Sequence, residues 1–493
     1  MSDHSDMDAG VARRRAARGV IFLGLRSAAV QICAFAGTVV LSRALEPSDF
    51  GTFAVLQFVL SFFQVFGDAG IGAALIQSRT PPSEDALGTV FTFHLLLGLG
   101  VVGVVWLAAP ALFSVWPKLP PSAPWLLRAM SVTFLLTALR AIPALVLERS
   151  LRFGAVAVAE VAQIVAFYVV ASACALAGLR DWTWPVALFA QATVGAIVIW
   201  VAQPWRPRLS FDVALLKPLL RFGLPFQLKN LVGFANGALT PLFGGAVLGT
   251  AAVGLLGWGQ QLAYLPLRLV EVVARVAFPL FSRLQYDRDG LARVFERALQ
   301  FCALAIFFTS ALFLTAGPNI TVVVFSRKWL EGLVALYAFS AVILIGFVSP
   351  VVGAIFDALG RPAIIARLAL GWTALNWVVT PLAAWRWGFP GFVYGTCAHV
   401  VVGNAAVLVV LRFLVPEARI ARSLAGPAVG ATLVAAFGWF VLRPWANTPL
   451  RLAAGVAAAL AAHLIAFAIV DPHAPGAMRR LVFASERELD SPG

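Results

Sequence analysis

The chain has 493 residues, of which 61% are hydrophobic and 12% are charged, about half the charged share of a soluble domain. One water-soluble core cannot cover so much apolar side chain, since such cores stop growing at about 250–300 residues. The net charge of +14 would suit nucleic acid, but the Lys and Arg residues fall between apolar segments and form no basic domain. We therefore expect a polytopic membrane protein that has no nucleic-acid partner.

The N-terminal segment, residues 1–17, is polar and carries Arg13, Arg14 and Arg15. It resembles the basic start of a signal peptide, but the apolar run that follows continues to Leu41. That run is too long for the apolar region of a signal peptide and lacks a convincing cleavage site. We expect it to be retained as the first membrane-spanning helix.

A spanning helix needs about 20 mostly apolar residues, and fourteen segments of the chain fit this requirement. Their connections are too short to house a soluble domain, so we expect an all-α polytopic membrane protein. The predicted spans are 18–41, 50–67, 87–109, 125–147, 155–177, 184–202, 223–247, 252–279, 297–316, 333–356, 363–384, 389–411, 424–442 and 449–470.

The connections alternate in positive charge. With the N-terminus placed in the cytoplasm, the cytoplasmic segments hold twenty-two Lys and Arg residues, and the opposite loops hold eight. Membrane proteins keep such an excess on the cytoplasmic side. The asymmetry supports an even number of spans and predicts that both termini are cytoplasmic.

Seven basic residues lie within or at the ends of predicted spans, where a charge near the bilayer centre costs about 2.5–3.5 kcal/mol on insertion scales. They are Arg26, Arg128, Arg140, Lys229, Arg268, Arg275 and Arg367. Such residues usually face a partner or a water-filled cavity.

A shift of 203 residues superposes polar positions of the first two spans on the seventh and eighth. The pairs are Arg26 with Lys229, Gly51 with Gly254, Gln57 with Gln260, and Asp68 with Glu271. Chance is the alternative, but the match favours a parallel duplication of two six-helix lobes. The predicted parts are a cytoplasmic segment 1–17, an N-lobe 18–205, a C-lobe 206–415, two further helices 416–470 and a cytoplasmic tail 471–493.

Helical spacing places Lys229, Gly233, Asn236 and Thr240 on one stripe of the seventh span. Such a stripe either glues helices together or lines a cavity, and the cations favour the cavity. Arg268, Glu271 and Arg275 share a face of the eighth span in the same way. Because one acid then stands between two bases, we expect Glu271 to neutralise one arginine and leave the other free.

These patterns give the candidate site. We expect a cationic cavity that binds substrate and is supported by polar residues nearby, with no catalytic group, metal or cofactor. The cationic residues are Arg26, Lys229, Arg268 and Arg275, and the supporting or coupling residues are Asp68, Glu271, Gln57, Gln260 and Asn236. Glu160 and Gln163 share a face of the fifth span and form a weaker candidate pair.

Two segments resemble a known family. The stretch from Leu41 to Gly51, LSRALEPSDFG, is similar to the loop after the first helix of Wzx-type polysaccharide transporters, and Gly67–Gln77, GDAGIGAALIQ, is similar to the segment that follows. Leu147–Phe153 and Ala358–Pro362 resemble later elements. These transporters are a branch of the multidrug/oligosaccharidyl-lipid/polysaccharide exporter superfamily, and the resemblance covers most of residues 18–415.

The resemblance implies a two-lobed transporter of six plus six helices, often with two more, in a bacterial inner membrane. Such proteins move undecaprenyl-pyrophosphate-linked sugar units from the cytoplasmic to the periplasmic leaflet by alternating access. The expected partners are the lipid-linked oligosaccharide, the bilayer, and the polysaccharide polymerase and export machinery as further candidates. The alternatives are a small-molecule exporter of the same superfamily and a membrane-embedded polymerase or ligase.

Overall fold

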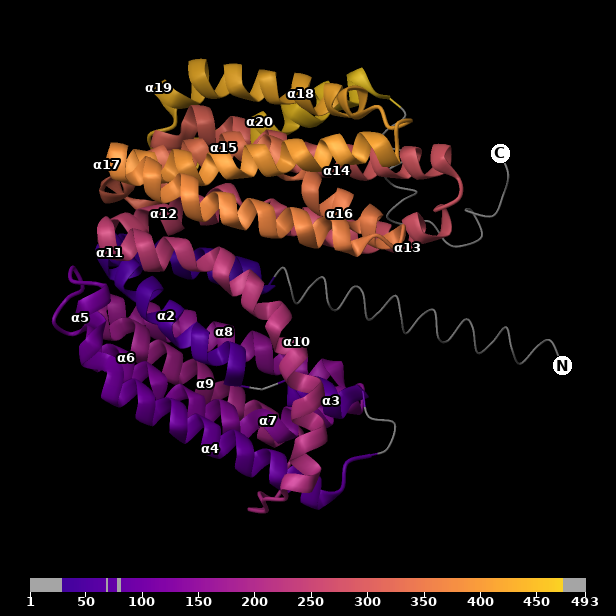
Figure 1. Cartoon of the computed structure of the whole chain (residues 1–493). Helices are drawn as coiled ribbons and strands as arrows, with labels where there is room; N and C mark the ends of the chain where they lie inside the picture. The colour runs from indigo at the N-terminus through magenta and orange to yellow at the C-terminus, as the bar shows by residue number, and fades with distance from the viewer. Residues whose placement is uncertain (1–28, 68–69, 78–80, 473–493) are drawn as a thin grey trace. The chain divides into compact units, whose positions relative to one another are not determined.

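The computed structural model describes residues 29–67, 70–77 and 81–472, and these residues form helices joined by short connections, with no strand among them. The chain divides into two compact units, Met1–Val253 and Gly254–Gly493, which Figure 1 colours from indigo to magenta and from rose to yellow. The all-α prediction is therefore confirmed. Each unit is described by itself below.

Within the described residues, ten helical segments are long and apolar enough to cross a bilayer, and Ala29–Ala44 is a shorter apolar helix. The ten are Pro47–Val65, Glu84–Val115, Ala123–Arg149, Phe153–Leu176, Arg180–Ala202, Arg288–Phe325, Arg327–Ala358, Ala363–Leu414, Ile420–Trp445 and Pro449–Val470. The chain is thus a multi-pass membrane protein, and the number of fourteen spans stays a prediction.

Several predicted spans differ in detail from the observed helices, among them the eighth, eleventh and twelfth. The eleventh and twelfth predicted spans both lie in α17 (Pro362–Leu414), which has a kink at Gly388. The φ of Gly388 is +62°, a conformation that glycine adopts at no steric cost. The eighth is two helices, α12 (Thr250–Ala263) and α13 (Leu267–Arg283). Pro266 stands directly before α13, as expected for a residue that has no N–H to continue a helix.

The segment LEPSD determines where α2 (Pro47–Gly67) begins. Pro47 occupies the first helical position, where its fixed φ is already helical, and the carboxylate of Asp49 accepts a hydrogen bond of 2.9 Å from the Glu46 N–H. This reciprocal contact satisfies a donor that the helix start leaves without a partner. The family-like loop is therefore a helix cap in this protein.

The first unit contains the following helices: α2, α3 (Ile71–Gln77), α4 (Glu84–Ala108), α5 (Leu112–Val115), α6 (Ala123–Ser131), α7 (Thr133–Arg149), α8 (Phe153–Leu176), α9 (Thr183–Ala202), α10 (Val213–Leu239) and α11 (Gly245–Val247). Helix α8 packs along α9, and α4 packs along α7. Trp184 of α9 is the centre of an aromatic cluster, stacked on Phe53 at 4.4 Å and met edge-on by Phe50. Alanines at the α8–α9 contact allow the two backbones to approach closely.

Helix α10 corresponds to the predicted seventh span, which the sequence places in the C-lobe beginning at residue 206. In the structure α10 packs against α2, α3 and α4 of the first unit. Within α10, Gly223 lies so close to Gly70 that a Cβ added to Gly70 would lie 2.4 Å from the Gly223 oxygen. Beyond the C-terminal end of α10, Trp116 Nε1 donates to the Pro241 carbonyl at 2.8 Å, and Lys118 Nζ donates to the Val247 carbonyl at 2.6 Å.

The second unit contains α13, α14 (Arg288–Ile320), α15 (Leu333–Gly346), α16 (Val348–Ala358), α17, α18 (Ile420–Phe437), α19 (Arg443–Trp445) and α20 (Pro449–Val470). Helix α14 is contacted by α13, α15, α18 and α20, and Figure 1 shows α14 running alongside α18 and α20. Small residues bring α18 and α20 together: a Cβ on Gly430 would lie 2.5 Å from Nδ1 of His463. His463 Nε2 in turn lies 3.1 Å from the Leu304 carbonyl of α14.

Candidate functional site

The predicted cationic residues of the second unit lie on one face of α13. Arg268, Glu271 and Arg275 all lie outside the buried core, as the helical spacing predicted. The opposite face buries Val270 and Ala277 among residues of the core formed with α14 and α16. Helix α13 therefore places its charges outside the core of its own unit.

The prediction that Glu271 neutralises one of these arginines was wrong for the described residues. Among the described residues no carboxylate oxygen lies within 4.0 Å of the Arg268 or Arg275 guanidinium, and Glu271 pairs with neither. Accessible side chains gain little from such a pair, because water screens the attraction and the long side chains lose rotamer freedom. Within the described part of the chain, both Arg268 and Arg275 thus lack an ion-pair partner.

The other predicted residues are scattered. Arg26 and Asp68 lie outside the described residues, and Lys229 lies in α10 at a position whose side chain is also outside them. Asn236 is exposed on α10, and Gln260 is half-buried on α12. On α2 the Oε1 atom of Gln57 is buried without a hydrogen-bond partner.

The polar stripe of the seventh span does not serve close helix packing. Among the described residues, an added Cβ on Gly233 or Gly237 would meet no atom within 4 Å, and Asn236 between them is exposed. Glycines that glue helices stand where two backbones touch. The cavity-lining interpretation of this stripe therefore stays open as a prediction, while the gluing interpretation finds no contact at these glycines.

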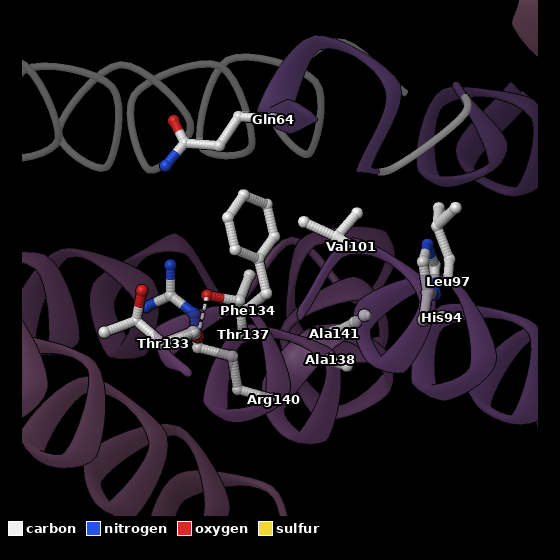
Figure 2. Close-up of a pocket in the computed structure, with 11 residues that line it drawn as sticks. Gln64, His94, Leu97, Val101, Thr133, Phe134, Thr137, Ala138, Arg140 and Ala141 are labelled. Carbon is white, nitrogen blue, oxygen red and sulfur yellow. Dashed lines mark hydrogen bonds between the residues drawn. The ribbon is translucent and has the colours of Figure 1, made fainter. Parts of the chain in front are cut away.

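The first unit contains a pocket of about 380 Å³ that the sequence did not single out. It lies between α2, α4 and α7, and Figure 2 shows Gln64 of α2 across the pocket from Phe134 and Arg140 of α7. Its polar lining residues are Gln64, His94, Thr133, Thr137 and Arg140, and its apolar lining residues are Leu97, Gly98, Val101, Phe134, Ala138 and Ala141.

Arg140 is the charged residue of this pocket. It lies within the span Ala123–Arg149, about 13 Å along the helix axis from Arg149 at a rise of 1.5 Å per residue. Its Nη1 donates a hydrogen bond of 2.8 Å to Oε1 of Gln163 on α8, and no carboxylate in the described part of the chain lies within 4.0 Å of it. Four of the five guanidinium donors thus have no partner among these residues.

The surrounding helices leave room for this contact. Gly195 of α9 faces it directly: an added Cβ would lie 2.8 Å from Gln163 Oε1 and 2.9 Å from Arg140 Nη1. One turn further along α7, Pro143 interrupts the helical hydrogen bonds. Gly195 and Pro143 therefore shape the helix surfaces that hold the arginine.

Magnitudes decide between a structural and a functional role for Arg140. A hydrogen bond between membrane helices contributes about 0.6 kcal/mol on average and up to about 1.7 kcal/mol. A central arginine costs roughly 2.5–3.5 kcal/mol to insert, so the bond to Gln163 does not offset it. A polar pocket beside the guanidinium supplies the remaining solvation, either as water or as a ligand. This geometry can bind an anion inside the membrane-spanning part of the unit.

The sequence analysis named both residues of this contact, Arg140 and Gln163, but did not predict that they would bond each other. Arg140 stood among the seven intramembrane basic residues, and Gln163 in a weaker candidate pair. Neither took part in the 203-residue repeat, which directed attention to Arg26, Lys229, Arg268 and Arg275. The signal that could have found the site is the depth of Arg140 together with the absence of an acid one turn away on α7.

Comparison with known proteins finds relatives that are named for the biosynthesis of bacterial polysaccharides. Among characterised relatives, the teichuronic acid biosynthesis protein TuaB of Bacillus subtilis is 24% identical over 63% of this chain and 64% of its own length. The lipopolysaccharide biosynthesis protein WzxC of Escherichia coli is 25% identical over 65% of each chain. The chain thus spans slightly under two thirds of the length of these two relatives. The succinoglycan biosynthesis transport protein ExoT of Rhizobium meliloti is 24% identical over 85% of each chain.

Solved structures share the fold. The lipid II flippase MurJ in an inward closed conformation superposes with a TM-score of 0.71 over 94% of this chain and 99% of its own, at 12% identity. An inward-facing MATE multidrug transporter gives a TM-score of 0.60 over 79% of this chain and 95% of its own, at 15% identity. The family model described as "Polysaccharide biosynthesis protein" matches residues 40–334, more than half of the chain. This chain therefore belongs to the polysaccharide biosynthesis protein family.

Proposed function

We propose that this protein is a flippase, which moves a lipid-linked oligosaccharide from the cytoplasmic to the outer leaflet of a bacterial inner membrane. The observation that carries the proposal is Arg140, a membrane-embedded arginine that lines a polar pocket and has no carboxylate partner in the described chain. Membership of the polysaccharide biosynthesis family supports it, as do relatives that are named for teichuronic acid, lipopolysaccharide and succinoglycan biosynthesis. The proposed activity is transport and includes no chemical step.

The substrate explains why a transporter would keep intramembrane cations. A lipid-linked oligosaccharide carries an anionic pyrophosphate and a polar sugar, and neither enters hydrocarbon unless protein groups replace their water. The attraction between guanidinium and phosphate grows as the local dielectric falls, and the planar fork of arginine matches phosphate oxygens. Arg140 and the polar residues beside it supply such groups within the first unit.

The other predicted residues complete this proposal. Arg268 and Arg275 offer two further charges, without an ion pair in the described chain, on the accessible face of α13. Arg26 and Lys229 remain candidates by their positions in the sequence. Two six-helix lobes, alternating access, cytoplasmic termini and a polysaccharide polymerase as a downstream partner belong to the same proposal. Asp68, Glu271, Gln57, Gln260 and Asn236 are assigned to support of the lobes or to coupling.

The test is transport in liposomes that contain the purified full-length protein. The probe is a fluorescent undecaprenyl-pyrophosphate-linked sugar, whose movement between leaflets is read by loss of protection from an added quencher. Arg140→Ala should lower the transport rate at least tenfold, and Arg140→Lys should retain part of it. Arg152→Ala is the matched control, since Arg152 is exposed and bonds Gln203 at the end of α9. Full transport by Arg140→Ala and by the Arg268→Ala/Arg275→Ala double variant would overturn the proposal.

A small-molecule exporter is the rival outcome, because a MATE transporter shares the fold. Deletion of the gene in its host separates the two. A flippase predicts that lipid-linked sugar intermediates accumulate on the cytoplasmic side. An unchanged lipid-linked pool together with altered drug resistance would favour the exporter.

A further inference from the structure

The second unit contains a charged pocket of about 460 Å³ that belongs to neither the predicted site nor the Arg140 pocket. It lies where α14 and α18 begin and α20 ends, which is one end of three membrane-crossing helices. Its lining residues are Asp289, Ala292, Arg293, Glu296, Arg297, Gln300, Glu417, Arg419, Arg422, Ser423 and Asp471.

The arginines of this pocket have no partners among the described residues. No hydrogen bond or ion pair engages the guanidinium of Arg293, Arg297, Arg419 or Arg422, and Nη1 of Arg297 is buried without a partner. Arg293, Arg419 and Arg422 are exposed and Arg297 is half-buried, so the loss of hydration that an anion or bound water would replace is confined to Nη1 of Arg297. The pocket therefore offers guanidinium donors to a negatively charged group.

Most of the acids in the pocket are already engaged. Glu296 Oε1 accepts the Arg419 backbone N–H at 2.5 Å, and Asp471 accepts from Gln300 Nε2 at 2.9 Å. Glu417 lies 3.9 Å from Arg288, which is outside the pocket lining. Asp289 is exposed at the start of α14. The contacts of Glu296 and Asp471 thus hold the pocket walls together. Oε2 of Glu417 is buried without a hydrogen-bond partner in the described chain, and the guanidinium groups remain available.

An apolar groove of about 850 Å³ continues from the pocket along the end of α17 and the start of α18. Arg419 and Arg422 line both hollows, and Arg412 adds a further guanidinium without a partner in the described chain. The groove is otherwise mostly apolar; it is lined by Leu408, Val409, Leu411, Val415, Pro416, Ala418, Ile420, Ala421 and Leu424. A ligand that fills both hollows needs an anionic head joined to an apolar body.

We propose that this composite site binds an anionic phospholipid of the surrounding membrane. Its phosphate would lie among Arg293, Arg297, Arg419 and Arg422, and its acyl chains would lie along the groove between α17 and α18. The position fits, because the ends of spanning helices lie at the depth of lipid headgroups, where basic pockets between helices recognise anionic lipid heads. Arginine suits the phosphate through its bidentate fork.

Two simpler interpretations account for part of the site only. Arginines that served membrane orientation alone would all be solvated, as the exposed Arg293, Arg419 and Arg422 are, whereas Nη1 of Arg297 is buried. A site for free phosphate would explain the arginines but not the apolar groove that shares two of them. The combined lining selects a phospholipid over either alternative, and this inference does not depend on the transported substrate.

The test uses native mass spectrometry of the full-length protein in detergent, titrated with phosphatidylglycerol and separately with phosphatidylcholine. The wild-type protein should retain phosphatidylglycerol in preference to phosphatidylcholine. The variant Arg419→Gln/Arg422→Gln should weaken phosphatidylglycerol retention at least tenfold without changing phosphatidylcholine retention. The matched control is Arg206→Gln/Arg208→Gln, which removes the same charge from exposed positions outside both hollows.

A second variant tests the apolar half and remains informative if the double variant fails to fold. Ala421 is exposed in the groove, so Ala421→Trp should fill it and weaken phosphatidylglycerol retention with no change in charge. Displacement of the lipid by excess glycerol 3-phosphate would indicate a free-phosphate site and overturn the proposal. Equal retention of both phospholipids, or preferential displacement by undecaprenyl pyrophosphate, would also overturn it.

Discussion

The indole Nε1–H of Trp200 donates a hydrogen bond of 3.1 Å to the backbone carbonyl of Leu139. That carbonyl would accept from residue 143 in an uninterrupted helix, but residue 143 is proline and has no N–H. Trp200 of α9 thus supplies from a neighbouring helix the donor that α7 lacks. The repaired carbonyl belongs to the residue directly before Arg140, so the interruption of the backbone and the intramembrane cation are neighbours on α7.

This relationship predicts coupling between Trp200 and Pro143. Trp200→Phe removes the donor and should lower stability by about 1 kcal/mol, the usual net value of one hydrogen bond. With Pro143→Ala in place, the backbone gains an N–H at position 143 that bonds the Leu139 carbonyl, and Trp200→Phe should then cost much less. The measurement is a double-mutant cycle on thermal unfolding in detergent. Additive losses in the two backgrounds would contradict the repair.

Gly195 is predicted to be essential for the Arg140–Gln163 contact. In Gly195→Ala the new Cβ would lie 2.8 Å from Gln163 Oε1 and 2.9 Å from Arg140 Nη1, so the side chains must separate. Transport in the liposome assay should fall severalfold while the protein still inserts and folds. Gly103→Ala on α4 is the control, because its Cβ would meet nothing within 4 Å. Equal activity of the two variants would refute the geometry.

Asp49 is predicted to stabilise the start of α2. Asp49→Ala removes the acceptor of the Glu46 N–H and should cost about 0.5–2 kcal/mol, the range measured for helix caps. Asp49→Asn keeps an acceptor oxygen and should cost less. Arg180→Gln should have a small effect, since the Arg180 guanidinium is largely exposed and 4.0 Å from Asp49. Thermal unfolding of the three variants gives the order, and a larger loss in Arg180→Gln than in Asp49→Ala would contradict it.

Trp116 is predicted to hold the segment after α10 to the first unit. Its Nε1 donates to the Pro241 carbonyl at 2.8 Å in a buried position, so Trp116→Phe leaves a buried acceptor without its partner. The loss should be about 1–3 kcal/mol. Hydrogen exchange at residues 242–248 should rise in this variant and not in Trp125→Phe, since the Trp125 ring is exposed. Unchanged exchange would show that the segment is held by its other contacts.

The class of fold was predictable because the length of an apolar run and the charge of its flanks are local properties of the chain. The start of α2 had a signal in Pro47 and Asp49, which fall at the positions that a helix cap requires, but the predicted span began at residue 50. The break before α13 had its signal in Pro266, but the apolar run 252–279 hides the interruption. Composition sets whether a segment can enter the membrane, whereas single residues decide where the helix stops.

The contact between Arg140 and Gln163 was not predictable from the sequence for a different reason. Arg140 and Gln163 lie on separate helices, and periodicity tells which residues share a face but not which faces meet. The 203-residue repeat described positions within helices in the same way, and it could not say whether Glu271 would turn toward Arg268 or Arg275. Tertiary packing decided both outcomes: it joined Arg140 to Gln163, and it left Arg268, Glu271 and Arg275 without an ion pair in the described chain.

The contact of Gly70 with Gly223 limits which residues these two positions can accept in this protein. At this crossing two main chains touch with no side chain between them, and Gly70 has a φ of +69° that disfavours any other residue. When a saturation-mutagenesis library is selected for polysaccharide production, every substitution at positions 70 and 223, including alanine, should therefore be depleted. Insertion of one methyl group there is expected to be less tolerated than removal of a whole side chain from the lipid-facing surface.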